Sequence, residues 1–153
     1  MDTFGLILGS GHIGKIHEKR LESRGVNCVC VDGREDCLKM LRKGVVSRFD
    51  FVLVATPANS HFEYAKLALE LGKDVFVEKP LATSSADAKH LVALANEKER
   101  LLFVGHSERF NPAFERFQKM FLREIRCGTL KSIDFVRHNL FSVRGRDVSA
   151  AFD

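Results

Sequence analysis

Short, mostly apolar runs of four or five residues recur along the first two thirds of the chain, and polar stretches with helical character separate them. Runs of this kind predict strands that are buried on both faces of a parallel sheet. We expect five such strands, at residues 4–8, 27–31, 51–55, 74–77 and 101–104.

The stretches between these runs predict helices that glycines terminate. The expected helices are 15–24 before Gly25, 34–43 before Gly44, and one from Asn59 or Ser60 to residue 71 before Gly72. A further helix starts at Ser84 and Asp87, which have capping-box spacing. Alternating strands and helices predict an α/β fold, a Rossmann-like doubly wound parallel sheet.

The pattern changes after Gly105. Residues 106–110 read as a loop, Asn111 and Pro112 as an N-cap and first-turn pair, and a helix should run from there to about residue 125. Residues 130–140 then alternate apolar and polar positions, which predicts a half-exposed strand of a different sheet. We therefore expect two domains, a dinucleotide-binding domain over 1–106 and the beginning of a substrate or oligomerisation domain over 107–153.

The first predicted strand is followed by glycines in G-x-G-x-x-G spacing, which is typical of a dinucleotide-binding turn. Gly9 allows a tight turn, Gly11 leaves room for a pyrophosphate beside the backbone, and Gly14 lets the helix pack closely on the strand. The helix N-terminus attracts the anion. His12 and Ile13 belong to this candidate cofactor-binding turn, although the side chains of His12 and His17 are expected on the helix surface.

Asp32 follows the second predicted strand and lies 18 residues beyond Gly14. An acid about 20 residues on is expected to bind the adenosine ribose. A carboxylate there repels a 2′-phosphate, so we predict NAD as the cofactor. NADP stays an alternative because Arg34 lies nearby. The alternative is a βαβ unit that binds no ligand.

The composition is that of an ordinary globular chain: 153 residues, 45% hydrophobic and 29% charged. No apolar run approaches the roughly 20 residues of a membrane span, and no signal peptide is evident, so we expect a cytoplasmic protein without a membrane partner. The four cysteines show no metal-ligand spacing and are interpreted as reduced packing residues, with no metal site. They are Cys28, Cys30, Cys37 and Cys127.

The formal charge of +4 is uneven, because residues 109–146 hold nine Lys or Arg against three acids. A basic segment can attract nucleic acid, but no recognition motif accompanies it. We favour a solvated face or a site for an anionic substrate.

Four motifs together resemble the Gfo/Idh/MocA oxidoreductases, and the resemblance covers nearly the whole chain. They are GSGHIG at 9–14, ATPANSH at 55–61, VEKP at 77–80 and VGHSERFNP at 104–112. The resemblance implies an N-terminal Rossmann domain and a C-terminal α/β domain that carries substrate residues and often the oligomer interface.

The resemblance also implies that Lys79 is the active-site lysine, that Glu78 lies beside the nicotinamide, and that the peptide before Pro80 has unusual geometry. Alcohol oxidation needs a group that takes up the hydroxyl proton, and a lysine whose pKa is lowered can do so. The alternative is a surface ion pair between Glu78 and Lys79.

By the same resemblance, a second segment runs past the nicotinamide ribose and the pyrophosphate; its residues are Thr56, Pro57, Asn59 and His61. A polar residue at a helix start is an equally good interpretation of His61. His106 and Arg109 could contact substrate, but a loop cap and a structural salt bridge explain them equally well.

The chain departs from the family pattern in two ways. Only 18 residues separate Asp32 from Phe51, so we expect a sheet that is narrower by one edge strand. The chain also stops at Asp153, before the histidine motif that the resemblance predicts, so we expect it to bind cofactor but to be catalytically incomplete.

The leading hypothesis is an NAD(P)-dependent oxidoreductase that transfers hydride between nicotinamide and a secondary alcohol of a sugar, sugar nucleotide or polyol. It would act as a homo-oligomer. The second hypothesis is a non-catalytic dinucleotide-binding module or partner subunit. The third is a basic interaction protein that binds nucleic acid, which we do not expect.

Overall fold

The computed structural model describes residues 3–124. These residues fall into two compact units, one that ends at Gly105 and one that begins at His106. The proposal that the second unit begins a substrate or oligomerisation domain stays a prediction.

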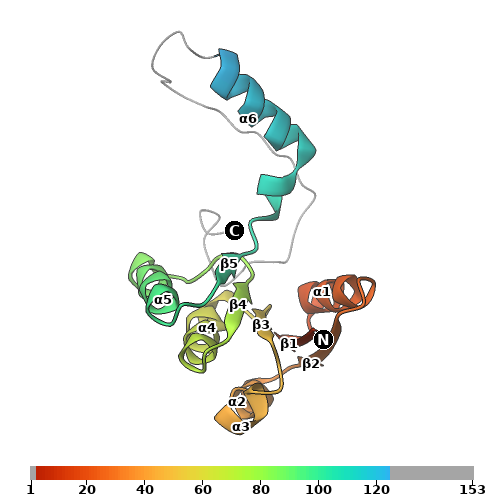
Figure 1. Cartoon of the computed structure of the whole chain (residues 1–153), viewed down its shortest axis with the longest axis vertical. Helices are drawn as coiled ribbons and strands as arrows, with labels where there is room; N and C mark the ends of the chain where they lie inside the picture. The colour runs from red at the N-terminus through yellow and green to blue at the C-terminus, as the bar shows by residue number, and fades with distance from the viewer. Residues whose placement is uncertain (1–2, 125–153) are drawn as a thin grey trace. The chain divides into compact units, whose positions relative to one another are not determined.

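The first unit contains a five-stranded parallel sheet in the order β2-β1-β3-β4-β5 (Figure 1). Its strands are β1 Phe4–Leu8, β2 Asn27–Val31, β3 Phe51–Val54, β4 Asp74–Val77 and β5 Leu102–Val104. In the centre, Leu6 of β1 lies opposite Val29 of β2 and Val52 of β3. The predicted α/β doubly wound sheet is therefore confirmed.

Helices connect these strands: α1 His12–Glu22, α2 Arg34–Met40, α3 Lys43–Val46, α4 His61–Glu70 and α5 Ser85–Glu97, with a 3₁₀ turn η1 Ala58–Ser60 before α4. Ser84 is the N-cap of α5, because its Oγ accepts a hydrogen bond from Asp87 N at 3.1 Å, and its hydroxyl donates to Asp87 Oδ2 at 2.7 Å. The expectation that Gly44 ends a helix is wrong: α2 ends at Met40, Arg42 has extended backbone, and Gly44 lies inside α3. A helix of one turn tolerates a glycine because few helical hydrogen bonds depend on it.

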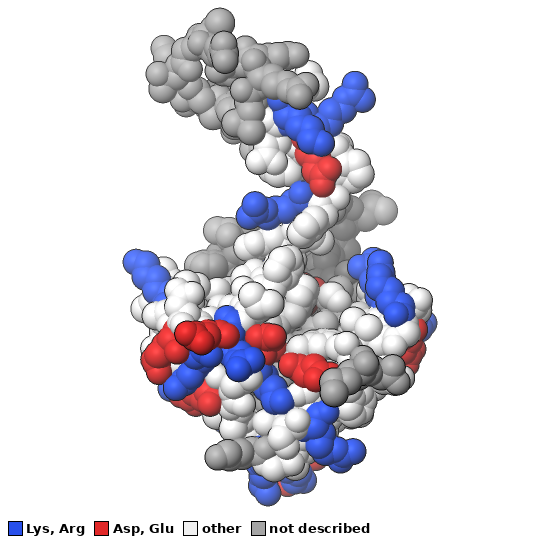
Figure 2. Space-filling view, viewed as in Figure 1, with Lys and Arg blue, Asp and Glu red and all other residues white. Residues whose placement is uncertain are grey.

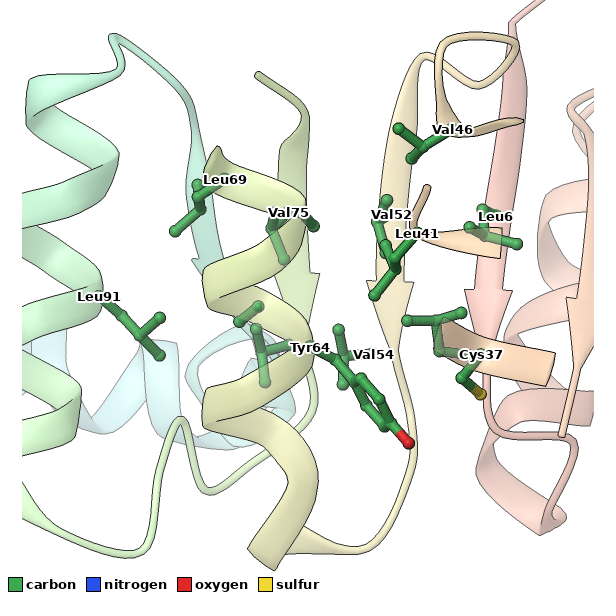
Figure 3. Close-up of a cluster of buried hydrophobic side chains, with 14 of the residues drawn as sticks. Leu6, Cys37, Leu41, Val46, Val52, Val54, Tyr64, Leu69, Val75 and Leu91 are labelled. Carbon is green, nitrogen blue, oxygen red and sulfur yellow. The ribbon is translucent and has the colours of Figure 1, made fainter. Parts of the chain in front are cut away.

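One face of the sheet is covered by α2, α3, α4 and α5 and forms a closed core. Val52, Val54 and Val77 contribute sheet side chains with no exposed surface, and Leu69 and Leu91 of the helices are equally buried. Figure 3 shows the Tyr64 ring reaching from α4 toward Val54 and Cys37.

The other face is open. Of the described helices of this unit, α1 is the one that lies over it (Figure 1). Side chains of β3, β4 and β5 that alternate away from the core line a groove of about 440 Å³ beside α1. The rings of Phe76 and Phe103 stack there with centroids 5.4 Å apart, and Phe103 is 48% exposed.

Residues 33–50 form two short helices and no strand, so β2 is an edge strand, in agreement with the expected narrower sheet. No helix in the described range is long and apolar enough to cross a membrane.

The second unit, as far as residue 124, comprises a 3₁₀ turn η2 Ser107–Phe110, where a loop was expected, and helix α6 Pro112–Glu124. Asn111 Oδ1 accepts a hydrogen bond from Ala113 N at 3.0 Å, which confirms the predicted N-cap. Arg109, Arg116 and Lys119 are exposed. The predicted strand at 130–140, Cys127 and the part of the basic segment beyond residue 124 lie outside the described residues.

Candidate functional site

The candidate site lies at the carboxyl edge of the sheet, where β1 to β4 all end because the strands are parallel. Ligands of open α/β sheets bind at this edge. The segments that follow the four strands contain all thirteen candidate residues: Gly9, Gly11, His12, Ile13, Gly14, Asp32, Arg34, Thr56, Pro57, Asn59, His61, Glu78 and Lys79.

The glycine turn between β1 and α1 has a separate steric reason for each glycine. Gly9 has φ +103°, and a Cβ there would lie 2.5 Å from the Ala55 carbonyl oxygen. A Cβ on Gly14 would lie 1.8 Å from Gly9 O, so only glycine allows α1 to approach β1 this closely. A Cβ on Gly11 would meet nothing within 4 Å, so this position is open to a ligand.

The N-terminus of α1 is suited to an anion. Gly11 is its N-cap, so no side chain caps the first N–H groups, and no acid occupies the first turn. His12 is exposed and Ile13 is half-buried at the start of the helix. The uncapped donors and the helix dipole together could hold a phosphate.

Asp32 lies at the end of β2 beside this turn. Its carboxylate accepts hydrogen bonds from Ser10 Oγ at 2.9 Å and from Gly33 N at 2.9 Å. These bonds, from Gly33 first and Ser10 second, hold the pKa of Asp32 below its usual range. Asp32 is therefore an exposed, oriented carboxylate that can accept from a ribose hydroxyl.

Arg34 forms a two-point ion pair with Glu63 of α4. The Nη1–Oε2 distance is 2.6 Å and the Nη2–Oε1 distance is 2.7 Å. The expectation placed Arg34 near the cofactor but named no partner for it, because Glu63 lies 29 residues further on.

His61 is buried, with 1% of its surface exposed, and bridges the segments after β3 and β4. Its Nδ1 lies 2.6 Å from Pro80 O, and its Nε2 lies 2.8 Å from Thr56 O. A neutral ring can donate to one of these carbonyls, and a doubly protonated ring to both. His61 is the first residue of α4, as the helix-start interpretation predicted, and its ring is buried between the two loops. A contact between His61 and the cofactor stays a prediction.

The loop after β3 presents its other candidates outward. Pro57 and Asn59 are exposed, and Thr56 is half-buried and accepts a hydrogen bond from Ser60 Oγ at 2.8 Å. His61 fixes this loop to the Lys79–Pro80 segment, so the two loops form one continuous rim.

Glu78 pairs with His17 of α1, with 2.6 Å between His17 Nε2 and Glu78 Oε1. Burial raises the pKa of Glu78, but the hydrogen bond and charge of His17, with the N–H and ammonium of Lys79, outweigh it and the net pKa is lowered. Gly105 leaves room for the carboxylate, since a Cβ there would lie 3.1 Å from it. The expectation that His17 lies on the helix surface is wrong: its side chain is 18% exposed because it turns toward the sheet.

Lys79 is exposed and directly precedes a cis peptide bond to Pro80, the unusual geometry that the resemblance implied. Its backbone N–H donates to Glu78 Oε2 at 3.3 Å. The ammonium is therefore presented at the same rim as the glycine turn and the loop after β3, where it could exchange a proton with a bound molecule.

A family model described as an oxidoreductase family with an NAD-binding Rossmann fold, Gfo/Idh/MocA, matches residues 15–106. The chain belongs to the Gfo/Idh/MocA oxidoreductases. The resemblance seen in the four motifs is thereby confirmed.

Relatives in the Gfo/Idh/MocA family include sugar-nucleotide and polyol dehydrogenases. The chain is 25% identical over 158 residues to UDP-N-acetylglucosamine 3-dehydrogenase of Acidithiobacillus ferrooxidans, which covers 96% of this chain and 49% of that enzyme. It is 28% identical over 129 residues to myo-inositol 2-dehydrogenase of Thermotoga maritima, and this match covers 74% of this chain and 39% of that enzyme. The solved structure of GenD2 from gentamicin A biosynthesis in complex with NAD matches with a TM-score of 0.66 at 28% identity, covering 80% of this chain and 39% of that one. The chain thus spans about half the length of these relatives or less.

Sequence reasoning missed Ser10, His17, Glu63 and Gly105 as parts of this Gfo/Idh/MocA site. A signal existed for His17, because it lies three positions after Gly14 and therefore on the helix stripe that faces the sheet. Glu63 and Gly105 contact site residues that lie far from them in the sequence, so no local pattern indicated their roles. His106 and Arg109 are exposed in the second unit, and their contact with substrate stays a prediction.

The described cysteines are free, as expected, and do not form part of the rim. Burial raises the pKa of Cys30 to about 11, with Glu18 adding to the effect. Cys28 lies near Glu18 and Glu22, and the three ligand atoms lie within 4.8 Å of one another. Burial and these carboxylates also raise the pKa of Cys28.

Proposed function

We propose that this chain provides the cofactor-binding part of an NAD(P)-dependent oxidoreductase that transfers hydride between nicotinamide and a secondary alcohol of a sugar, sugar nucleotide or polyol. One observation carries the proposal: an open anion-binding turn, an oriented carboxylate and an exposed lysine lie along one sheet edge. The activities of the dehydrogenases described above support the substrate class.

The described residues fit a dinucleotide. The α1 N-terminus and Gly11 would hold the pyrophosphate, with His12 and Ile13 beside it. Asp32 would accept from the adenosine ribose, which favours NAD, and the rim of Thr56, Pro57 and Asn59 would follow the cofactor toward Lys79.

When bound, nicotinamide supplies the hydride acceptor or donor. Lys79 would take up the hydroxyl proton of the alcohol at Nζ, or return it in the reverse direction. Glu78 lies next to it in sequence and is kept ionised by the hydrogen bond with His17, which outweighs the effect of burial. His61 would keep the Lys79–Pro80 segment at a fixed distance from the loop after β3.

The test is calorimetric titration of the chain with NAD and NADP, followed by a screen of secondary alcohols for NADH formation. In a version of the protein that turns over substrate, Lys79→Ala should leave the NAD dissociation constant within about threefold while lowering turnover at least about 100-fold, since the proton transfer arises in the transition state. Lys89→Ala, an exposed lysine on α5, is the matched control.

Equal losses in binding and turnover would instead assign Lys79 to cofactor positioning. Tight NAD binding without turnover of any substrate by the unmodified chain would favour the non-catalytic module and would agree with the expected catalytic incompleteness. Failure of the folded chain to bind NAD or NADP would refute the proposed function.

A further inference from the structure

The ion pair between Arg34 and Glu63 connects the adenosine end of the proposed site to a different helix. Arg34 is the first residue of α2 and comes two residues after Asp32. Glu63 lies in the first turn of α4, which begins after the loop that follows β3. Both Nη atoms of Arg34 are within 2.7 Å of a Glu63 oxygen, so the carboxylate binds the end-on edge of the guanidinium through two of its five N–H donors.

The same fork is what a phosphate would need. A guanidinium binds a carboxylate or a phosphate through two parallel hydrogen bonds, and it cannot make both sets with the same N–H groups at once. In dinucleotide sites, an arginine near the acid after the second strand accommodates the 2′-phosphate of NADP. Arg34 has the position and chemistry for this role, but Glu63 already holds the two donors of its end-on edge and offsets its charge.

Glu63 is well placed to hold Arg34. It lies in the first turn of α4, where the helix dipole favours a negative side chain. Its side chain is 36% exposed and that of Arg34 is 68% exposed, so the pair lies at the surface where a nucleotide could reach it.

We propose that Glu63 is a specificity-determining residue, which withholds Arg34 from a 2′-phosphate and thereby makes the preference for NAD depend on two carboxylates, Asp32 and Glu63. The inference rests on the proposed function, because it requires a dinucleotide at this sheet edge. NADP then meets repulsion from Asp32 and must also displace Glu63 before it gains Arg34.

The experiment is a set of calorimetric titrations with NAD and NADP on the wild-type chain, Glu63→Gln, Arg34→Ala and the double variant. Glutamine keeps the shape of Glu63 but loses its charge, so Glu63→Gln should raise NADP affinity relative to NAD about fivefold, near the upper range for one exposed ion pair. The double variant should lose this gain, because Arg34 would no longer be present to use it. Glu70→Gln removes the same charge from the other end of α4, where it pairs with Lys66 at 3.8 Å, and should leave the ratio within about twofold.

The outcomes separate the two proposals. An unchanged NADP-to-NAD ratio in folded Glu63→Gln would overturn the inference while NAD binding itself stands. A gain that persists in the double variant would also overturn it, because loss of repulsion alone would then suffice. Binding of neither dinucleotide by the folded wild-type chain would refute the proposed function and the inference with it. Repeating the series with 5′-AMP and 2′,5′-ADP should reproduce the same pattern, since these ligands probe the adenosine end alone.

Discussion

The face of the sheet under α2, α3, α4 and α5 is closed, whereas the face under α1 is open. On the closed face, valines of β3 and β4 meet leucines and alanines of α4 and α5 with almost no exposed surface (Figure 3). On the open face, Phe103 is 48% exposed and Leu101 is 74% exposed.

Helices on both faces contribute to the candidate site. From the open side, α1 contributes the glycine turn and His17, which pairs with Glu78. From the closed side, α4 contributes His61 and Glu63, which fix the loops and Arg34. We infer that burial on the closed face stabilises the unit and that α1 mainly shapes the site.

Acidic and basic side chains are interspersed over the surface of this unit that Figure 2 shows. Neither sign of charge therefore forms a separate patch in that view. The difference between the faces is therefore one of packing.

The largest expected effect comes from a matched pair of leucines. Leu91→Ala on the closed face should destabilise the chain by about 3 kcal/mol, because the fully buried side chain leaves a cavity. Leu101→Ala on the open face should cost less than about 1 kcal/mol, because the leucine is mostly solvated. Urea unfolding followed by circular dichroism measures both, and equal losses would contradict the comparison.

Substitutions of two glycines at the start of α1 should separate an effect on stability from an effect on cofactor binding. Gly14→Ala should cost about 2 kcal/mol of stability or more, since its Cβ would overlap Gly9 O. Gly11→Ala should leave stability nearly unchanged but weaken NAD binding about tenfold or more, because its Cβ enters the space expected for the pyrophosphate. Melting curves and NAD titrations of both variants test this. An unchanged NAD affinity in Gly11→Ala would contradict the placement of the pyrophosphate beside Gly11.

The pH dependence of stability should show how much the pair between His17 of α1 and Glu78 contributes to the fold. The pKa of Glu78 lies below its reference of 4.5 in the folded chain, so its carboxylate stabilises the fold at neutral pH. This contribution should disappear as the pH falls below about 4.5 through the folded-state pKa. Glu78→Gln should cost about 1 kcal/mol at neutral pH and flatten the acid limb of the stability profile. An unaltered acid limb in this variant would show that the pair with His17 contributes nothing.

The smallest expected effect concerns the orientation of Asp32. Ser10→Ala removes one of its two hydrogen bonds and should weaken NAD binding about threefold, the equivalent of about 0.6 kcal/mol. Ser23→Ala, which removes a hydroxyl bonded to Arg20 O on the far end of α1, should have no effect on binding. A loss of similar size in both variants would point to a general effect on α1.

Much of the fold was predictable because its signals are local. The limits of β2 and β4 agree with the expected runs at 27–31 and 74–77, since both are short apolar segments bounded by turn residues. The separate helix α3 was not foreseen, because one turn leaves no periodic pattern and Gly44 resembled a stop.

The site was predictable as a set of positions but not as a set of pairs. His17 and Glu78 are 61 residues apart, and no spacing rule joins α1 to the end of β4. The burial of His61 was detectable in principle, since it shares the helix stripe of Ala65 and Ala68. Its two carbonyl partners depend on how two loops meet, which only the tertiary structure defines.

The central claim is that the carboxyl edge of β1 to β4 forms one dinucleotide site. The most direct test is an NMR titration of the isotope-labelled chain with NAD, followed through backbone amide shifts. We predict that the perturbed amides cluster at residues 9–14, 32–34, 56–61 and 78–80, with little change in the groove beside Phe76 and Phe103. Saturable shifts confined to that groove, or no shifts at millimolar NAD in a folded sample, would contradict the claim.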